Sequence, residues 1–189
     1  MGLEKRILIL QIPRGIFGGD LLLVGKQGEK VACFSNTIRT SPRELFQDPT
    51  FPDLQGYYFA AAAVASDMQG EGLYSEMNRK RVADVIGNGY EFTPLVFTRT
   101  QNPLVEAGIS SALKEFKGKG RYMGFTLERR FVPGVYGEML TGTKPPRSPE
   151  KHVQQAYDGL DVEKGDAFVL IFHLEHDMTC NPEGAAYYP

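Results

Sequence analysis

The sequence predicts a mixed α/β (α+β) fold, and three observations lead to this class. The middle of the chain alternates between strand-like and helix-like segments, as a crossover unit between parallel strands does. Strand-like apolar runs lie before and after this unit. The 189 residues, of which 42% are hydrophobic, are enough to bury one sizeable core. We therefore expect residues 1–189 to form a single domain.

The first part of the chain is predicted to form strands. Residues 5–12 are a short apolar run, and we expect a buried strand there rather than a signal peptide, because no small-residue cleavage site follows. Residues 21–24 and 31–38 are two further strands, and the glycine-containing residues 25–30 between them indicate a hairpin turn. Prolines then dominate, with room for one helical turn at residues 43–46.

The central part carries the crossover unit. Residues 57–64 form an apolar run of strand length; its alanines would also suit a helix, but its aromatic start and polar end favour a buried strand. Residues 73–86 have an apolar stripe at helical spacing. Residues 92–98 form the next strand. Asn102 and Pro103 then begin a second helix, as N-cap and first helical residue.

The last part of the chain returns to strands. Residues 123–131 and 167–174 are predicted strands because both are apolar runs of suitable length. Residues 141–149 contain prolines and indicate a loop, and residues 150–157 suit a short helix. The order of elements is therefore several strands, then one crossover unit, then strands again.

Composition excludes several classes of function. The 21 basic and 23 acidic residues give a formal charge of −2, a balance that does not indicate nucleic-acid binding but leaves room for a local basic patch around an anionic cofactor. No apolar run approaches the roughly 20 residues that span a bilayer. The two cysteines, Cys33 and Cys180, do not suggest a disulfide framework or a metal site. We expect a cytoplasmic protein without nucleic-acid or membrane partners.

The loop that joins the strand at 57–64 to the helix at 73–86 has the form of an anion-binding turn. The first amides of a helix lack carbonyl partners, and the helix dipole adds positive charge there. Gly70 and Gly72 would let the backbone approach a phosphate closely. The alternative is a tight turn that needs positive φ at these glycines. The loop is neither a Walker motif nor a Rossmann fingerprint, since Tyr74 stands where a third glycine would be.

The context of this loop resembles the GNAT acyltransferase superfamily. The segment Gln69-Gly70-Glu71-Gly72 is similar to the start of the family's motif Gln/Arg-x-x-Gly-x-Gly/Ala, and it departs at the sixth position, Tyr74, whose side chain we expect to point away along the helix. Downstream, Asn88-Gly89-Tyr90 resembles the family's entry into its next strand. Asn102 resembles the asparagine that begins the family's following helix.

This resemblance implies a mainly antiparallel twisted sheet with a splayed parallel strand pair, at 57–64 and 92–98, and flanking helices. Acetyl-CoA or another acyl-CoA would lie between the splayed strands as the co-substrate. The residues that the resemblance assigns to its pantetheine arm and phosphates are Ala63, Val64, Ala65, Gln69, Gly70, Glu71, Gly72, Leu73, Tyr74 and Asn102.

The resemblance implies direct attack of an amine on the thioester, which requires a base and an acid. In many family members a tyrosine acts as the acid that protonates the leaving thiolate. Ile109 stands at that position here, so the neighbouring Ser110 is a candidate hydrogen-bond donor to the thiolate. The family's glutamate base is also missing, and Tyr58 is a candidate proton relay. His173 is a candidate base because histidine exchanges protons near neutral pH. Each of these residues also has a purely structural explanation.

Two departures concern the acceptor side. Residues 13–20 are too short to hold the family's two N-terminal helices, whose absence would expose apolar surface that a homodimer would cover. An insertion at about 132–166 is expected to close the acceptor site instead. The predicted function is transfer of an acyl group to a small-molecule or peptide amine. The alternative is a non-catalytic CoA-binding or regulatory module, and a purely structural glycine turn also stays open.

Overall fold

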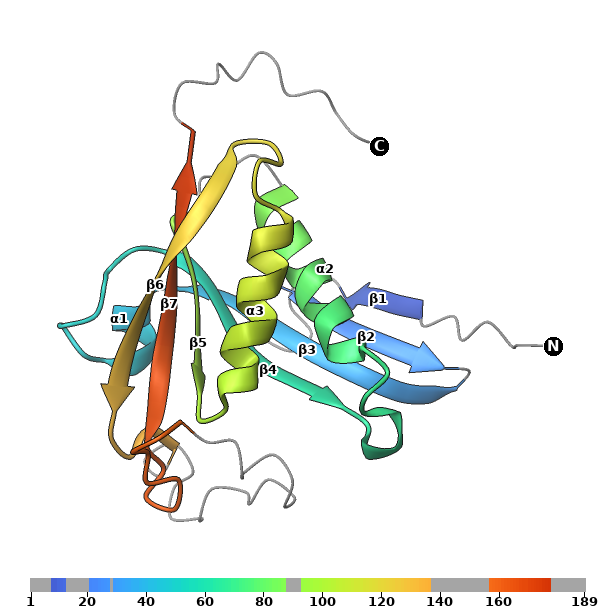
Figure 1. The fold of residues 1–189 in the computed structure, drawn as a ribbon, viewed down its shortest axis with the longest axis horizontal. Helices are drawn as coiled ribbons and strands as arrows, with labels where there is room; N and C mark the ends of the chain where they lie inside the picture. The colour runs from blue at the N-terminus through green and yellow to red at the C-terminus, as the bar shows by residue number, and fades with distance from the viewer. Residues whose placement is uncertain (1–7, 13–20, 28, 88–92, 137–156, 178–189) are drawn as a thin grey trace.

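The computed structural model describes residues 8–12, 21–27, 29–87, 93–136 and 157–177. These residues form one seven-stranded sheet, in the order β1-β2-β3-β4-β5-β7-β6, with helices on both faces (Figure 1). The strands are β1 (Leu8–Ile12), β2 (Leu21–Gln27), β3 (Lys30–Thr40), β4 (Gly56–Val64), β5 (Leu95–Thr100), β6 (Tyr122–Val132) and β7 (Ala167–His176). The helices are α1 (Pro42–Phe46), the 3₁₀ turn η1 (Ser66–Met68), α2 (Leu73–Gly87) and α3 (Pro103–Glu115).

The sheet is mixed and mainly antiparallel, as predicted. Within it, β4 and β5 are the parallel pair, and the other neighbouring strands run antiparallel. The predicted order of strands and helices is confirmed for the described residues. The helix expected at residues 150–157 falls almost entirely outside them, as does most of the insertion expected at about 132–166.

Two predicted boundaries are wrong for identifiable reasons. The strands β2 and β3 continue into the turn expected at 25–30, because an irregularity in their register at Gly25 and Lys26 lets pairing resume beyond the glycine. The strand β5 begins at Leu95 rather than at residue 92. Pro94 precedes it directly and cannot donate a ladder hydrogen bond.

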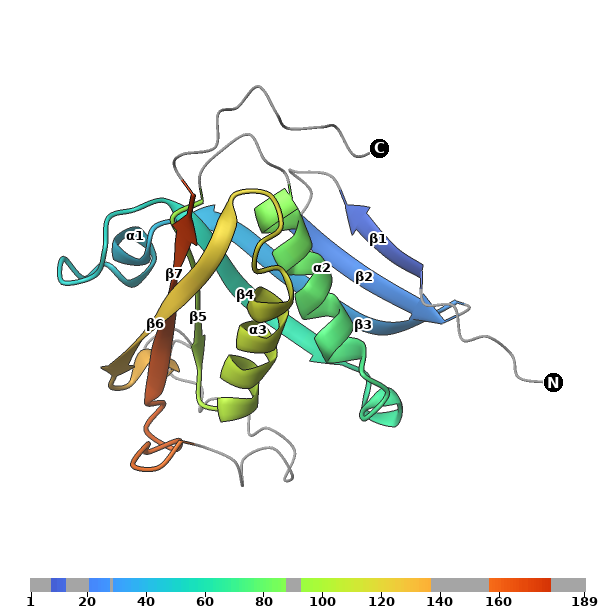
Figure 2. The same cartoon turned by 45° about the horizontal axis from the view of Figure 1, so that its top comes forward.

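The helices divide between the two faces of the sheet (Figures 1 and 2). On one face, α2 and α3 pack side by side, α2 against β3 and β4 and α3 against β6. On the other face, α1 contributes to a cluster with Tyr58 and Phe97. Asn102 caps α3 as predicted, since its Oδ1 accepts a hydrogen bond from the Leu104 amide at 2.9 Å.

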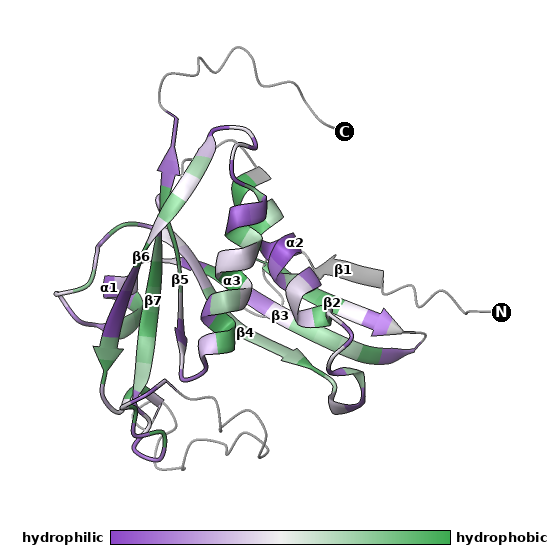
Figure 3. Ribbon diagram, in the orientation of Figure 1, coloured by the Kyte–Doolittle hydropathy of each residue, from purple (hydrophilic) through white to green (hydrophobic). Residues whose placement is uncertain are grey.

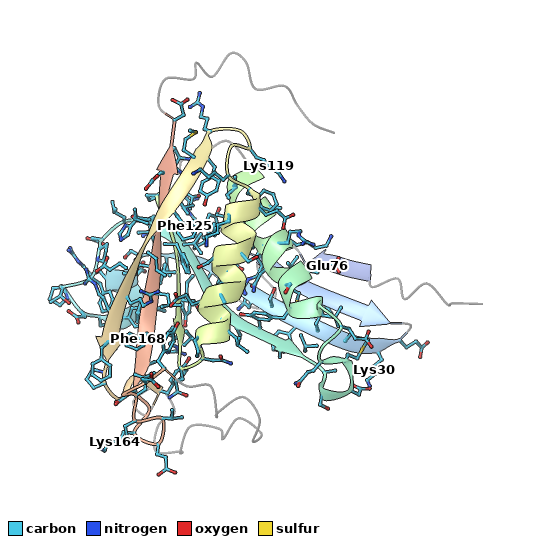
Figure 4. The ribbon with its side chains drawn as sticks, in the orientation of Figure 1. Lys30, Glu76, Lys119, Phe125, Lys164 and Phe168 are labelled. Carbon is cyan, nitrogen blue, oxygen red and sulfur yellow. The ribbon has the colours of Figure 1, made fainter. Side chains whose placement is uncertain are left out.

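The strand β7 lies between β5 and β6 and is buried on both faces. Residues 169–172 are 0% exposed, which matches the uninterrupted apolar run seen in the sequence. Phe125 and Phe168 lie on the side of β6 and β7 that packs toward α3 (Figure 4). This part of the sheet therefore forms the centre of the larger apolar core.

Two further expectations concern membrane-spanning segments and the cysteines. No helix among the described residues is long and apolar enough to cross a membrane. Cys33 is a free, buried thiol, and Cys180 lies outside the described residues.

Candidate functional site

The site forms where β4 and β5 separate. The two strands pair only at Tyr57 with Val96 and at Tyr58 with Phe97, although β4 continues to Val64 and β5 to Thr100. Beyond this point β4 stays paired with β3 alone and diverges from β5 (Figure 2). We call this separation the fork. It confirms the splayed parallel pair expected from the resemblance.

A bulge in β4 coincides with the fork. Asn36 and Thr37 are consecutive in β3, yet they oppose Ala61 and Phe59, so Ala60 is an extra residue in β4. At the same level, the Thr98 hydroxyl donates to the Phe59 carbonyl at 2.9 Å. This side-chain bond joins the two strands one residue beyond their last backbone pair.

The bulge decides which β4 amides face the fork. The Ala65 amide donates to the Ala32 carbonyl of β3 at 2.8 Å. Because successive residues of a strand direct their N–H and C=O groups to opposite sides, Ala63 also faces β3, whereas Ala62 and Val64 face the fork. The Ala65 N–H, expected from the sequence to meet the pantetheine arm, is therefore already used within the sheet. Ala62, which the sequence analysis did not name, faces the fork instead.

The loop after β4 brings a helix N-terminus to the open end of the fork. Gly70 and Gly72 adopt φ values of 87° and 79°, and a Cβ at either position would meet no atom within 4 Å. Both glycines therefore satisfy the tight-turn interpretation and also leave the backbone open to a ligand. The side chain of Leu73 is buried against Met77, so only its backbone can face the fork.

Tyr74 crosses from α2 to α3. A Cβ at Gly108 would lie 3.0 Å from Tyr74 Cε1 and 3.0 Å from Asn78 Nδ2, so the glycine makes room for both side chains. The expectation that Tyr74 points away along its helix is wrong, because this opening in α3 accepts the ring. Burial raises the pKa of the Tyr74 hydroxyl, although Asn78 and Arg81 oppose that shift.

Arg81 holds the bulge from the helix side, a role that the sequence pattern did not reveal. Its side chain donates to the Asn36 carbonyl at 2.9 Å and to the Thr37 hydroxyl at 3.2 Å. Its guanidinium lies 3.9 Å from the centre of the Phe59 ring. It is 2% exposed, and no carboxylate in the described part of the chain pairs with it. Burial lowers its pKa to about 10, opposed by the hydroxyls of Tyr74 and Tyr58.

Tyr58 lies at the fork on the opposite face of the sheet. Its ring centre is 5.2 Å from that of Phe97 and 6.5 Å from that of Phe46 in α1. Its hydroxyl is buried and makes no hydrogen bond to any described residue. Burial raises its pKa to about 12, even though Arg99 opposes the shift. Tyr58 therefore keeps its proton near neutral pH, so it can donate a hydrogen bond but is not a ready base.

The other two candidates for proton transfer come from α3 and β7. Ser110 is half-buried in α3, next to Ile109, which belongs to the apolar core. His173 pairs with Leu95, three residues before Thr98 in β5, or about 10 Å along the strand. Its Nε2 lies 3.0 Å from Glu128 Oε2. Burial raises the pKa of Glu128, but hydrogen bonds from His173 and Arg130 outweigh it and leave that pKa low. Both residues stay predictions as catalytic groups.

Comparison with known proteins is informative only at the level of structure. The chain matches no protein-family model, and no curated protein matches it significantly in sequence. A Bacillus subtilis acetyltransferase, solved in complex with CoA, aligns over 89% of this chain and 99% of its own, with a TM-score of 0.51 and 11% identity.

Two further solved structures align more loosely. Naa20 from Chaetomium thermophilum, in complex with a bisubstrate analogue, aligns over 82% of this chain and 65% of its own, with a TM-score of 0.44 and 13% identity. A Corynebacterium glutamicum protein described as histone acetyltransferase HPA2 and related acetyltransferase aligns over 89% and 71%, with a TM-score of 0.46 and 14% identity. The likeness to the Bacillus subtilis structure establishes that the fold is GNAT-like.

Proposed function

We propose that this chain is an N-acyltransferase that transfers an acetyl or other acyl group from acyl-CoA to a small-molecule or peptide amine. The fork carries the proposal: Ala62 and Val64 turn their backbone groups toward it, and a helix N-terminus begins at its open end. The backbone groups suit the amides of a pantetheine arm, and the helix N-terminus suits a pyrophosphate. The likeness of fold to an acetyltransferase solved with CoA supports the same conclusion.

The proposed contacts follow the order of the chain. The N–H and C=O groups of Ala62 and Val64 would hold the pantetheine arm, and one N–H would stabilise the oxygen of the thioester carbonyl during attack. The amides of residues 69–74 would hold the pyrophosphate. The Asn102 side chain already caps α3, so its presence is explained without a ligand. Of the proposed cofactor contacts, that of Asn102 therefore has the least structural support.

The reaction needs no covalent intermediate on the protein. The neutral amine of the acceptor attacks the carbonyl carbon, a C–N bond forms, and the C–S bond breaks as the CoA sulfur leaves. The amine must lose a proton and the sulfur must gain one. Tyr58, Ser110 and His173 remain the proposed residues for these transfers. Because Tyr58 keeps its proton, we assign it hydrogen-bond donation rather than base catalysis.

A non-catalytic CoA-binding module is the second candidate, and one observation favours it. By the resemblance, Ile109 stands where many family members have the tyrosine that protonates the leaving thiolate, and it is 1% exposed within the apolar core. No proton donor therefore replaces that tyrosine at the same place. Release of free thiol from acyl-CoA across a panel of amines distinguishes the two functions, because a binding module would release none.

Gly72→Ala tests the proposed CoA site, with Gly118→Ala as the matched control. Both glycines have φ of 79° and no atom within 4 Å of an added Cβ, but Gly118 lies in the turn between α3 and β6. We expect each variant to lose about 1–2 kcal/mol of stability from the same backbone strain. Only Gly72→Ala should weaken CoA binding, by tenfold or more in calorimetry. Equal CoA affinities of the two variants, or no CoA binding by the wild type, would overturn the proposal.

A further inference from the structure

Arg81 is a buried cation whose charge is not balanced within the described part of the chain. It is 2% exposed, and each nitrogen of its guanidinium donates to a neutral acceptor. These acceptors are the Thr37 hydroxyl at 3.2 Å, the Asn36 carbonyl at 2.9 Å and the Asn78 side-chain oxygen at 3.4 Å. Hydrogen bonds to neutral groups do not cancel a net charge, and burying a charge without a counter-charge is costly. The charge itself therefore calls for an explanation.

The side chains packed around Arg81 are uncharged near neutral pH. Its guanidinium lies 3.9 Å from the centre of the Phe59 ring in β4, and α3 contributes Ile109 to the same apolar cluster. The ionisable groups that affect its pKa are the hydroxyls of Tyr74 and Tyr58, and burial raises the pKa of both. Burial lowers the pKa of Arg81 only to about 10, so this residue stays charged. The region therefore holds a fixed positive charge in an environment of low dielectric constant.

Arg81 stands beside the end of the fork at which β4 and β5 still pair, which we call the apex. Phe59 is the first β4 residue beyond the last backbone pair, and its carbonyl accepts the hydrogen bond from Thr98. Asn36, whose carbonyl Arg81 holds, pairs with Ala61 just past the bulge. The guanidinium therefore lies next to the first β4 residues beyond the apex, on the face covered by α2.

The proposed path of the cofactor leads to the same place. From Val64 back to Phe59, the five residues of β4 span about 16 Å. α2 packs against β3 and β4 and runs back toward the apex (Figure 2), and the eight residues from Leu73 to Arg81 span about 12 Å. A pantetheine arm that starts at the loop after β4 and follows this strand would therefore bring its sulfur toward Arg81.

We infer that Arg81 stabilises the sulfur of CoA as it leaves as a thiolate, through the field of its buried charge rather than by contact. The inference rests on the proposed N-acyltransferase function. It also explains how the reaction can proceed with Ile109 at the position where, by the resemblance, many family members have the tyrosine that protonates the thiolate. A thiolate that is already stabilised by a cation does not need that acid.

The step balances without an acid on the protein. The neutral amine forms the C–N bond and loses its proton to a base, and the C–S bond breaks with its electron pair left on the sulfur. The thiolate takes a proton from water after CoA has left. A charge that is fixed in place before the reaction needs no reorganisation when the thiolate forms. In a protein interior it also acts over several ångströms, because little solvent screens it.

The test titrates the thiol of bound CoA and needs no acceptor. Calorimetry compares CoA with desulfo-CoA, which carries hydrogen in place of the thiol, over about pH 6 to 9, where a thiol near a cation titrates. A nearby cation favours the thiolate, so the thiol should have a lower pKa in the complex than in free CoA. Between these two pKa values the affinity for CoA, relative to desulfo-CoA, should rise about tenfold per pH unit, and above them it should level off.

Two wild-type outcomes separate this inference from the proposed function. If both ligands bind with the same dependence on pH, the bound thiol is not stabilised as a thiolate and the inference is wrong. If neither ligand binds, the proposed CoA site itself is contradicted.

Variants then assign the effect to Arg81. Arg81→Gln keeps a donor for the Asn36 carbonyl but removes the charge, so CoA should lose its pH-dependent advantage over desulfo-CoA. Loss of support for the bulge would instead weaken both ligands alike, which the affinity for desulfo-CoA measures. Arg79→Met is the control and should keep the advantage, since Arg79 forms an exposed ion pair with Glu115 at 2.8 Å. An Arg81→Gln protein that keeps the pH-dependent advantage would overturn the inference.

Discussion

The two halves of the sheet are built differently. From β5 through β7 to β6 the interior is mainly apolar: Leu95, Val96, Phe97, Ile171 and Phe172 are all 0% exposed, and the buried polar side chains of β5 are the small Thr98 and Thr100. From β2 to β4 the helix side also buries a small apolar cluster, but with it larger polar groups, namely Ser35, Thr37, Asn78 and Arg81. Figure 3 shows the same contrast: the middle of β7 is hydrophobic, whereas hydrophilic residues interrupt β3 and α2.

This difference follows from what each half does at the fork. Apolar contacts are strong in sum but weakly directional, so they stabilise a sheet without fixing the orientation of one carbonyl. Hydrogen bonds are directional, and Arg81 uses them to hold the carbonyl opposite the β4 bulge. The half in which β4 separates from β5 at a defined residue is therefore held by polar bonds, and the other half contains the fully buried strand β7.

The largest expected effect is on the apolar half. Phe172→Ala removes a fully buried ring from the main core, where it lies 5.5 Å from the Phe125 ring. We expect the free energy of unfolding to fall by about 3–5 kcal/mol in urea titrations. Phe172→Leu leaves a smaller cavity, so its free energy of unfolding should fall less and the chain should stay folded. Its CoA affinity should be unchanged. A loss of CoA affinity in folded Phe172→Leu would show that this half does more than stabilise.

Arg81→Met should reverse that pattern. It leaves the Asn36 carbonyl and the Thr37 hydroxyl without their buried partner, which we expect to lower the free energy of unfolding by about 2 kcal/mol. CoA affinity should fall tenfold or more, because the bulge that directs Ala62 and Val64 loses its support. Arg79→Met, on the same helix but exposed, should change stability by less than about 1 kcal/mol. Unchanged CoA affinity in Arg81→Met would refute the claim that the polar bonds of the β4 half hold the geometry of the fork.

The smallest effect concerns the contact between α2 and α3. An alanine in place of a helical glycine usually stabilises by about 1 kcal/mol. In Gly108→Ala the new Cβ would lie 3.0 Å from Tyr74 Cε1, so we expect a net loss of about 0.5–1 kcal/mol instead. Adding Tyr74→Ala should make the Gly108→Ala change less costly, although Asn78 Nδ2 would still lie 3.0 Å from the new Cβ. Thermal unfolding of the single and double variants measures this coupling, and additive effects would show that the ring and the glycine are independent.

The sequence predicted the parts of the site that depend on neighbours along the chain. The Asn102 cap and the glycine loop at 69–72 are recognisable because their geometry is set within a few residues. The fork was expected only through the resemblance, and its register came from the structure. The Ala60 bulge could not be read from a run of four alanines, since these small side chains mark neither face clearly.

The sequence by itself therefore determined the order of the elements, the fold class and the position of the loop after β4. Tertiary structure alone decided that β4 leaves β5 after Tyr58, that Arg81 holds the bulge, and that Arg99 of β5 lies against the Tyr136 ring. Periodicity and capping act between residues a few positions apart, so they leave a pattern in the chain. The register of two strands and the meeting of distant side chains depend on packing across the sheet, which no local pattern encodes.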